Sequence, residues 1–498
     1  MDDVGSLAQL ERAQLVQRTD DVELSYLFKH ALTQDSAYQT LLLKTRRNLH
    51  RSVAVAYEQF YPEQLEELAG LLAHHYSAGG EDDKAFAYAV RAGDGAARRS
   101  ANIEARTYYD QALAALSRLP DTTENRRRRV DAMLKRVAVA LRSEGPERSL
   151  ERMLEAEALA HTLDASGDEA GDRGRMARIH YWIGQTFLHS NRLTPAIRYL
   201  QEVLAFGESE GGGLEFVAVP SCMIGRAWVS LGYLDRAEPL LTRAVRLLEQ
   251  VPNLHEQTLA GAFLGLTLAG RGNYRAGLLR AQQTRDRALE SNHFGAIALS
   301  YLGLAVVYMS SGESESMLQA GHQMIEAANR TGDRLVAYLG HAFFGWAQSR
   351  LGNHAAAQES LAQSQELARA LGAHLIFDDW LAAARAEAAF NAGELAQAEE
   401  LAAAAVSYAL STDNIFAQAM AHRVWGQALT ARGAAHLADA GEHLATALQL
   451  FETGDARLEA AHTHIAWGTL CQAQGDADAA RAHWGQAREQ FEASGLRM

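Results

Sequence analysis

Residues 345–361, GWAQSRLGNHAAAQESL, carry the pattern that decides the fold of this chain. A glycine opens the segment, a second glycine follows at position 352, and a small and a large apolar residue stand at 357 and 361. Residues 386–402, AEAAFNAGELAQAEELA, repeat this order with alanine in the first and last places. Small residues at these spacings let two antiparallel helices touch, and the internal glycine suits the turn between them. The pattern therefore predicts a repeated pair of helices.

The residue that opens this pattern, which we call the anchor, recurs at intervals of about 40 residues. The anchors are Gly184, Gly225, Gly265, Gly303, Gly345, Ala386, Gly426 and Gly468. This period, with small residues twelve places after most anchors, is the layout of tetratricopeptide (TPR) repeats. One such helix pair cannot bury its apolar face alone, so neighbouring pairs have to stack. We predict an all-α, right-handed, TPR-like superhelical solenoid of about ten helix pairs, an architecture typical of binding rather than catalysis.

The composition agrees with a helical chain and excludes some classes of partner. Of 498 residues, 48% are apolar, and only 7 are prolines, which would interrupt helices. The formal net charge of -14 argues against a general nucleic-acid binder, which needs a basic face. The basic cluster Arg126–Arg129 is flanked by Glu124 and Asp131, a pattern that favours a solvated helix face.

The sequence also indicates a reducing, aqueous compartment. The two cysteines, Cys222 and Cys471, lie six anchors apart and provide no disulfide framework. The first residues, MDDVGSLAQLERAQLV, lack the basic and apolar regions of a signal peptide. No apolar run approaches the roughly 18 residues that a membrane-spanning helix needs. We therefore expect a cytoplasmic protein that binds no membrane.

The region from Tyr26 to Leu119 resembles one bacterial protein group. The similar segments are YLFKHALTQDSAY at 26–38, LLAHHY at 71–76, RAG at 91–93 and RSAN at 99–102. They resemble the large signalling ATPases of the STAND type, many of which bear an N-terminal nucleotide-cyclase domain. In that group the order is a cyclase or other effector, a P-loop ATPase, a winged helix and a long TPR array. The longer repeats also resemble the sensor solenoid of the maltose-regulon activator and related LuxR-type regulators.

The chain departs from both groups at informative points. No Gly-x-x-x-x-Gly-Lys-Ser/Thr segment exists, so the phosphate-binding loop of an ATPase is absent. LuxR-type regulators end in a helix-turn-helix domain, whereas this chain stops just after a helix ending near Phe491. The resemblance therefore implies the C-terminal half of a signalling protein, either as a separate gene or as a piece of a longer one.

We predict three regions on this basis. Residues 1–50 are a winged-helix remnant and connecting helix, residues 51–175 are degenerate TPR-like helices, and residues 176–498 are a TPR-like solenoid of eight repeats. Within the first region, Glu23–Leu32 reads as an extended segment. A helix is then expected to begin near Ser36 and to continue through Tyr57.

Motifs for chemistry are not found in the sequence. The 19 histidines include no His-Glu-x-x-His zinc motif. Four of them stand four residues before an anchor, a position that favours packing between helices over metal binding: His180, His341, His422 and His464. No nucleophile with a positioned base is discernible. We expect no enzymatic activity, no cofactor and no metal site.

One group of side chains remains as a candidate partner-binding site. The first helix of each TPR pair lines the concave groove, where large aromatic side chains would anchor a partner segment. The candidates are Trp346, Trp380 and Phe390, with Glu387 and Arg423 as charged contacts beside them. The alternative interpretation is that Trp380 and Phe390 pack against the adjacent repeat.

Three functional hypotheses follow. The first is a non-catalytic interaction module that binds a partner protein or peptide in its groove and serves a signalling ATPase or cyclase, in the same chain or in another. The second is a solenoid that senses a small molecule and controls a transcriptional or ATPase switch. The third is a fragment of a nucleotide cyclase whose catalytic domain is absent here.

Overall fold

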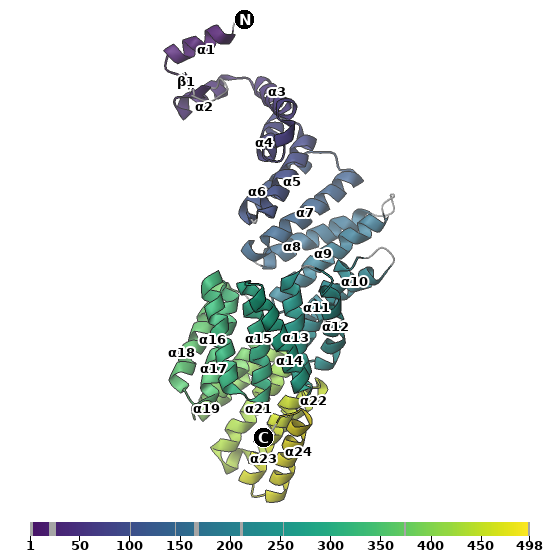
Figure 1. The fold of residues 1–498 in the computed structure, drawn as a ribbon, viewed down its shortest axis with the longest axis vertical. Coiled ribbons are helices and arrows are strands. Elements are labelled where there is room, and N and C mark those ends of the chain that lie inside the picture. The colour runs from purple at the N-terminus through teal and green to yellow at the C-terminus, as the bar shows by residue number, and fades with distance from the viewer. Residues whose placement is uncertain are drawn as a thin grey trace. The chain divides into compact units, whose positions relative to one another are not determined.

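The computed structural model describes residues 3–18, 26–99, 101–144, 146–163, 169–209, 213–251, 253–372 and 375–496. The chain divides into two compact units. Unit 1 comprises residues 1–144 and 158–166, and unit 2 comprises residues 145–157 and 167–498. Helices dominate both units (Figure 1), which confirms the predicted all-α, TPR-like fold.

Unit 1 starts with a helix and a small antiparallel sheet, in which Val16 pairs with Phe28. Its elements are α1 (Asp3–Arg12), β1 (Val16–Arg18), β2 (Tyr26–Phe28), α2 (Ala31–Thr40), α3 (Leu43–Phe60), the 3-10 helix η1 (Pro62–Gln64), α4 (Ala69–Gly79), α5 (Asp82–Arg98), α6 (Asn102–Leu116), α7 (Thr123–Glu144) and the 3-10 helix η2 (His161–Leu163). Helix α8 (Pro146–Ala160) begins in unit 2 and ends in unit 1. The predicted extended segment contains β2, while its residues 23–25 lie outside the described part.

The prediction of one helix from Ser36 through Tyr57 is wrong, because two helices meet in that stretch. The backbone is extended at Leu41 and Leu42, which separates α2 from α3. The Arg46 guanidinium in α3 donates hydrogen bonds to the carbonyl oxygens of Leu41 at 2.8 Å and Gln39 at 3.0 Å. Carbonyl groups at a helix end lack partners within the helix, and Arg46 supplies them here. The break is therefore stabilised by a side chain from the next helix.

The core of unit 1 lies among α4, α5 and α6. Leu72 and Tyr76 of α4 pack with Phe86 of α5 and with the small residues of α6. In contrast, α2 contains no buried residue and α3 buries only Ala54. Leu32 is 80% exposed, so apolar surface of this N-terminal stretch faces outward.

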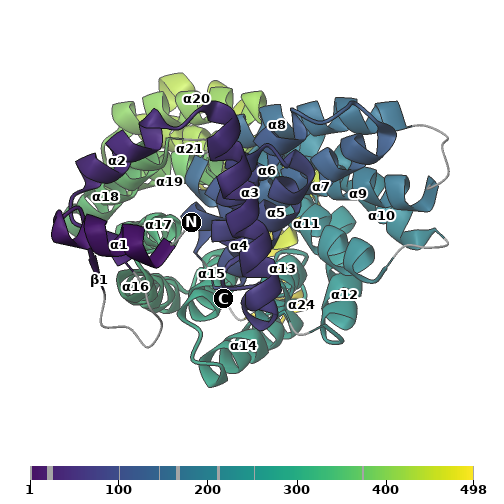
Figure 2. The same ribbon diagram turned by 90° about the horizontal axis from the view of Figure 1, so that it is seen from above.

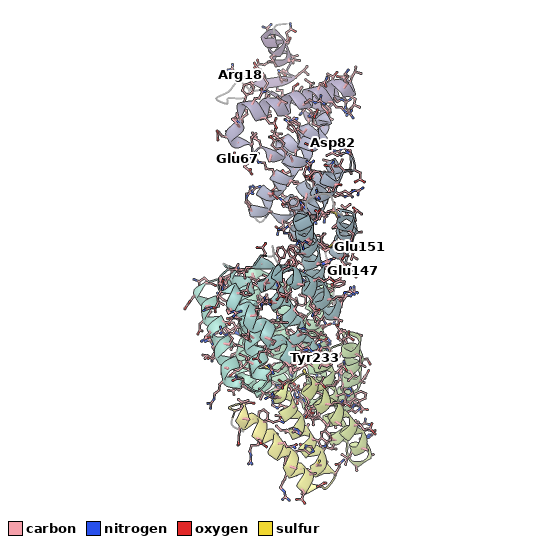
Figure 3. The ribbon with its side chains drawn as sticks, turned by 90° about the vertical axis from the view of Figure 1, so that its right-hand side faces the viewer. Arg18, Glu67, Asp82, Glu147, Glu151 and Tyr233 are labelled. Atoms are coloured by element: carbon pink, nitrogen blue, oxygen red, sulfur yellow. The ribbon has the colours of Figure 1, made fainter. Side chains whose placement is uncertain are left out.

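Exposed ion pairs cover the surface of unit 1. Asp82 at the start of α5 (Figure 3) pairs with Arg118 at 2.6 Å. Within the basic cluster predicted to be solvated, Arg126 pairs with Asp121 and Arg128 pairs with Asp83, each at 2.7 Å. Exposed pairs of this kind contribute little to stability, about 0–1 kcal/mol each. The cluster is thus a charged, solvated helix face.

Unit 2 contains eight successive helix pairs after α8. The pairs are α9 (Glu169–His189) with α10 (Leu193–Glu208), α11 (Glu215–Leu231) with α12 (Leu234–Leu248), α13 (Leu254–Gly270) with α14 (Tyr274–Glu290), α15 (Phe294–Ser311) with α16 (Ser314–Thr331), α17 (Arg334–Arg350) with α18 (His354–Leu371), α19 (Asp378–Asn391) with α20 (Leu395–Ser411), α21 (Ile415–Arg432) with α22 (Leu437–Thr453) and α23 (Arg457–Ala473) with α24 (Ala477–Ala493). The 3-10 helix η3 (Ala434–His436) precedes α22. Each anchor lies in the first helix of its pair.

The first helices of unit 2 form its inner layer. Figure 2 shows α11, α13, α15, α17, α19 and α21 on the inner side of the curve, with α12, α14, α16, α18 and α20 outside them. Turn glycines between paired helices have positive φ, as at Gly352 (81°) and Gly393 (78°). Only glycine adopts this conformation without strain, so the turn prediction made from these residues is confirmed.

Anchor glycines lie where two helices approach too closely for a side chain. A Cβ atom added at Gly225 would come within 2.7 Å of Leu241 Cγ, and one added at Gly345 would come within 3.0 Å of Leu361 Cγ. We expect Gly225→Leu or Gly345→Leu to lower the free energy of unfolding by about 1–3 kcal/mol through overpacking. Thermal denaturation followed by circular dichroism measures this change. An unchanged melting curve for Gly345→Leu would mean that the repeat register is misplaced.

The array of unit 2 curves until later pairs touch earlier ones. Helix α11 contacts α21, and α13 and α15 contact α23. Several bonds join earlier pairs to later ones, and we call four of them the closure contacts. They are Trp380 Nε1 to the Ser230 carbonyl at 3.2 Å, Leu234 N to the Gly454 carbonyl at 3.0 Å, Arg271 to Asp455 at 2.6 Å and His462 Nε2 to the Ser310 carbonyl at 3.0 Å. One continuous apolar core therefore includes residues from Ala218 to Phe491.

Helix α15 is long and apolar enough to cross a membrane, and among the described residues no other helix has this length and composition. However, 61% of its residues are buried inside the protein, between neighbouring repeats. Burial of this kind is the ordinary environment of a core helix in a stacked array.

Candidate functional site on the inner helices

The two tryptophans predicted to bind a partner lie in the packed interior of unit 2. Trp346 is fully buried, and Trp380 is 2% exposed. The Trp380 ring stacks on Phe416 at 4.1 Å between centroids, and its indole N–H donates to the Ser230 carbonyl. Phe390 is partly buried against small residues of neighbouring helices. Trp346 and Trp380 thus belong to the packed interior, whereas Phe390 is partly buried, and a direct role of these rings in partner binding stays a prediction.

The two charged candidates, Glu387 and Arg423, belong to ion pairs. Arg350 of α17 pairs with Glu387 of α19 at 2.6 Å, and Arg423 of α21 pairs with Glu459 of α23 at 2.6 Å. Burial raises the pKa of Glu387, but the charge and hydrogen bonds of Arg350 outweigh burial and hold this pKa below its ordinary value. Their role as partner contacts also stays a prediction, because each is already engaged within the protein.

Together these four residues form what we call the charge ladder, with alternating sign on four successive first helices. Sequence reasoning missed Arg350 and Glu459. The signal was present, since the four positions 350, 387, 423 and 459 are separated by 37, 36 and 36 residues, close to one repeat. A search for alternating charges at the repeat period would have found the ladder.

A second polar group on the inner helices has no such pairing. It consists of Gln185 on α9, Arg226 on α11 and Glu256 on α13, which we call the polar row. Buried atoms of all three side chains, Gln185 Oε1, Arg226 Nε and Glu256 Oε2, have no hydrogen-bond partner among the described residues. Buried polar groups are normally hydrogen-bonded, so these three atoms on adjacent helices are exceptions, as are Trp346 Nε1 and Glu459 Oε1 farther along the array.

The surroundings of the polar row are electrostatically coupled. Burial raises the pKa of Glu256, and the nearby Arg226 opposes that effect only in part. Burial likewise raises the pKa of the Cys222 thiol, which is therefore neutral. Arg226 also lies over the Phe263 ring at 5.2 Å. The row is thus a partly buried place that holds one positive and one negative side chain without a direct bond between them.

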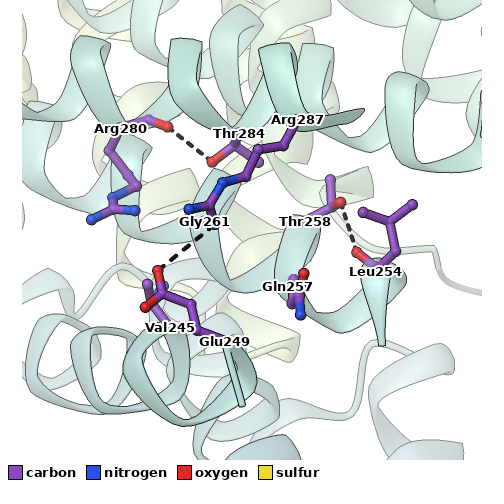
Figure 4. A pocket seen from close by; sticks show the side chains of 9 residues that line it. All are labelled: Val245, Glu249, Leu254, Gln257, Thr258, Gly261, Arg280, Thr284 and Arg287. Atoms are coloured by element: carbon purple, nitrogen blue, oxygen red, sulfur yellow. Dashed lines mark hydrogen bonds and ion pairs between the residues drawn. The ribbon is translucent and has the colours of Figure 1, made fainter. Parts of the chain in front are cut away.

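The cavity in Figure 4 lies elsewhere, among α12, α13 and α14. It measures about 30 Å³, and Glu249 and Arg287 pair across its mouth at 3.7 Å. The hydroxyl groups of Thr258 and Thr284 donate within their own helices, at 2.8 and 2.9 Å. A space of this size holds about one water molecule. It is a packing gap rather than a ligand site, because the threonine hydroxyl groups and the charged pair that line it already have partners within the protein.

Histidine pairs recur in the last two repeats. His422 and His443 approach at 2.9 Å between their Nδ1 atoms, and His464 and His483 approach at 3.0 Å. In each pair the second ring stacks on a tryptophan of the first helix. Among the described residues no three His, Cys, Asp or Glu side chains converge in a way that could hold a metal ion.

These pairs make the stability of the last repeats depend on pH. Burial, together with His443, lowers the pKa of His422 from 6.5 to about 4. The unfolded chain therefore binds a proton there that the folded protein excludes, and stability falls as pH drops from about 6.5 to about 4. Melting temperatures measured across this range should fall more steeply for the natural protein than for His422→Asn/His443→Asn. Equal slopes would show that the pair does not control acid sensitivity.

Comparison with known proteins supports the fold. The sequence matches no known protein-family profile. An uncharacterised protein of Rhizobium meliloti (strain 1021) is 35% identical over 89 residues, which are 18% of this chain and 9% of that protein. The chain thus matches only a small part of this relative's length.

Solved structures show the same kind of solenoid. A Rap protein complexed with competence and sporulation factor superposes with a TM-score of 0.52 and 11% identity, covering 81% of this chain and 99% of that one. The apo form of RapI gives 0.47 and 18% identity, covering 57% and 97%. A STAND protein with a TPR sensor from Pyrococcus horikoshii gives 0.39 and 16% identity, covering 73% and 52%. At 11% identity the likeness to the first of these structures shows the fold alone, a TPR-type helical repeat.

Proposed function

We propose that this chain is a non-catalytic binding module that holds a partner protein or peptide on the inner helices of unit 2. The observation that carries the proposal is the polar row, where three buried polar atoms on adjacent helices have no hydrogen-bond partner in the described part of the chain. In the charge ladder farther along the array, by comparison, each carboxylate has an arginine partner, whereas Glu256 has none within the described ranges.

The size of the spaces favours an extended partner over an enclosed small molecule. Small-molecule sites are typically cavities of about 300–1,000 Å³ that surround their ligand. The cavity of Figure 4 is about 30 Å³, and the depression beside it, of about 600 Å³ at Glu290 and Ser291, is open to solvent. A peptide lying along the inner helices needs no enclosed cavity.

The wider system is proposed from the sequence resemblance to STAND-type signalling ATPases. In this proposal the partner belongs to a cytoplasmic ATPase or cyclase system, and residues 1–50 derive from a winged-helix module. The antiparallel pair β1–β2 and the exposed helix α2 support the second point. Co-purification with an ATPase or cyclase encoded beside this gene tests the first, and its failure in co-expression would remove that assignment.

Selection of peptides tests the binding function itself. The full chain is used to select from a displayed library of random peptides, and enriched peptides are measured by fluorescence anisotropy. We expect saturable binding, whereas ATP with Mg²⁺ should leave the melting temperature unchanged because the sequence has no phosphate-binding loop. Failure to enrich any peptide, or stabilisation by ATP, would contradict the proposal.

A further inference from the structure

We infer that the polar row recognises the main chain of an extended peptide. This inference rests on the proposed binding function and adds to it which chemical group of the peptide is recognised. Along α9, α11 and α13 the row offers an acceptor at Gln185, a donor at Arg226 and an acceptor at Glu256. An extended main chain presents N–H donors and C=O acceptors in turn, which is the complementary order.

The charges of the row favour a neutral ligand. Arg226 and Glu256 carry opposite charge and interact with each other, so the pair has no net charge. A bound anion would be repelled by Glu256, and a bound cation would be repelled by Arg226. A peptide group is neutral and supplies one acceptor and one donor, so it can satisfy both side chains. Hydrogen bonds with one charged partner are stronger than those between neutral groups.

Comparison with the charge ladder shows why Glu256 lacks an ion-pair partner among the described residues. Glu256 and Glu459 occupy equivalent positions, each nine residues before its anchor. Glu459 pairs with Arg423, which stands three residues before the preceding anchor. The residue at that position in the earlier repeat is Cys222, a buried neutral thiol. The arginine that would neutralise Glu256 is therefore replaced by cysteine, whose thiol hydrogen-bonds the Glu256 carboxyl group but leaves its Oε2 atom to an external donor.

The spacing of the row suits a short peptide segment. Helix α11 packs against both α9 and α13. Adjacent helix axes lie about 8–10 Å apart, so the three helices extend across about 20 Å. An extended chain advances about 3.3–3.6 Å per residue, so about six residues would cross the row. Gln185, Arg226 and Glu256 would thus contact peptide groups about three residues apart in one strand-like segment.

Two substitutions and two matched controls test the inference. Peptides selected on the full chain are measured against Arg226→Gln and Glu256→Gln, and against Arg287→Gln and Glu290→Gln on the outer helix α14. We expect the first two variants to lose about tenfold or more in affinity, because each loses a hydrogen bond from a charged side chain to the peptide. The two controls should lose none. The melting temperature of each variant is measured as well, because Arg226 interacts with Glu256 and Phe263 and Glu256 hydrogen-bonds Cys222, so a loss of stability has to be separated from a loss of affinity.

Changes to the peptide main chain complete the test. Replacing single backbone N–H groups by N-methyl groups should weaken binding to the natural protein at one or two positions and have less effect on Glu256→Gln. Peptides that bind the variants and the natural protein equally would overturn the inference while leaving the binding function intact. Failure to obtain any binding peptide would overturn both.

Discussion

Replacement of Trp380 by alanine is expected to lower the free energy of unfolding by about 3–5 kcal/mol, the range for removing a large buried aromatic side chain. The ring is 2% exposed and stacks on Phe416, and its indole N–H holds the Ser230 carbonyl of a helix 150 residues earlier. The substitution therefore creates a cavity and removes a closure contact at once. Urea denaturation monitored by circular dichroism measures the loss.

Two controls separate a core tryptophan from a binding one. Phe390→Ala removes a partly buried ring outside the closure contacts and should cost less stability than Trp380→Ala. The double variant Trp346→Ala/Trp380→Ala should lose more stability than Trp380→Ala. If that double variant kept its melting temperature and lost peptide binding, the two tryptophans would be partner contacts. They would then have to leave their buried positions when the partner binds.

Replacement of Arg423 by leucine is the second large effect. Glu459, which is 2% exposed, would remain as a buried charge without its partner. Breaking a buried pair from one side costs about 3–5 kcal/mol. The variant should therefore unfold at lower denaturant concentration, with the largest increase in hydrogen exchange in α21 and α23.

Removing both charges should reverse most of this loss. Arg423→Leu/Glu459→Leu leaves no unpaired ion, and apolar replacements of buried pairs are often neutral or stabilising. Arg432→Leu is the matched control on the same helix, because its pair with Glu399 is partly exposed and worth about 0–1 kcal/mol. A single Arg423→Leu variant as stable as the natural protein would show that water already solvates Glu459.

Local patterns in the sequence predicted the local structure well. Gly345 lies against Leu361 as the repeat spacing required, and Gly352 adopts the turn conformation expected of it. Helix pairing depends on residues fewer than 20 positions apart, and such contacts leave a visible periodicity in the sequence.

The candidate site was predicted less well, and the reason is the curvature of the array. The repeat position of Trp380 predicted a place on the concave face, whereas the structure buries its ring and bonds its indole N–H to the Ser230 carbonyl. Curvature accumulates from a small rotation at each interface, so repeat spacing does not reveal which distant repeats meet. The polar row escaped notice for a related reason, because an unpaired Glu256 can be recognised only once its neighbours are known.

The closure contacts also determine how unit 2 responds to a mechanical pull. An open solenoid lengthens when its ends are separated, because each interface rotates slightly and repeats yield one at a time. Here the main-chain bond from Leu234 to Gly454 and the ion pair between Arg271 and Asp455 join the second and third pairs to the turn before the eighth. These bonds have to break before the pairs between them can spread. We therefore expect unit 2 to extend little under tension until these bonds break.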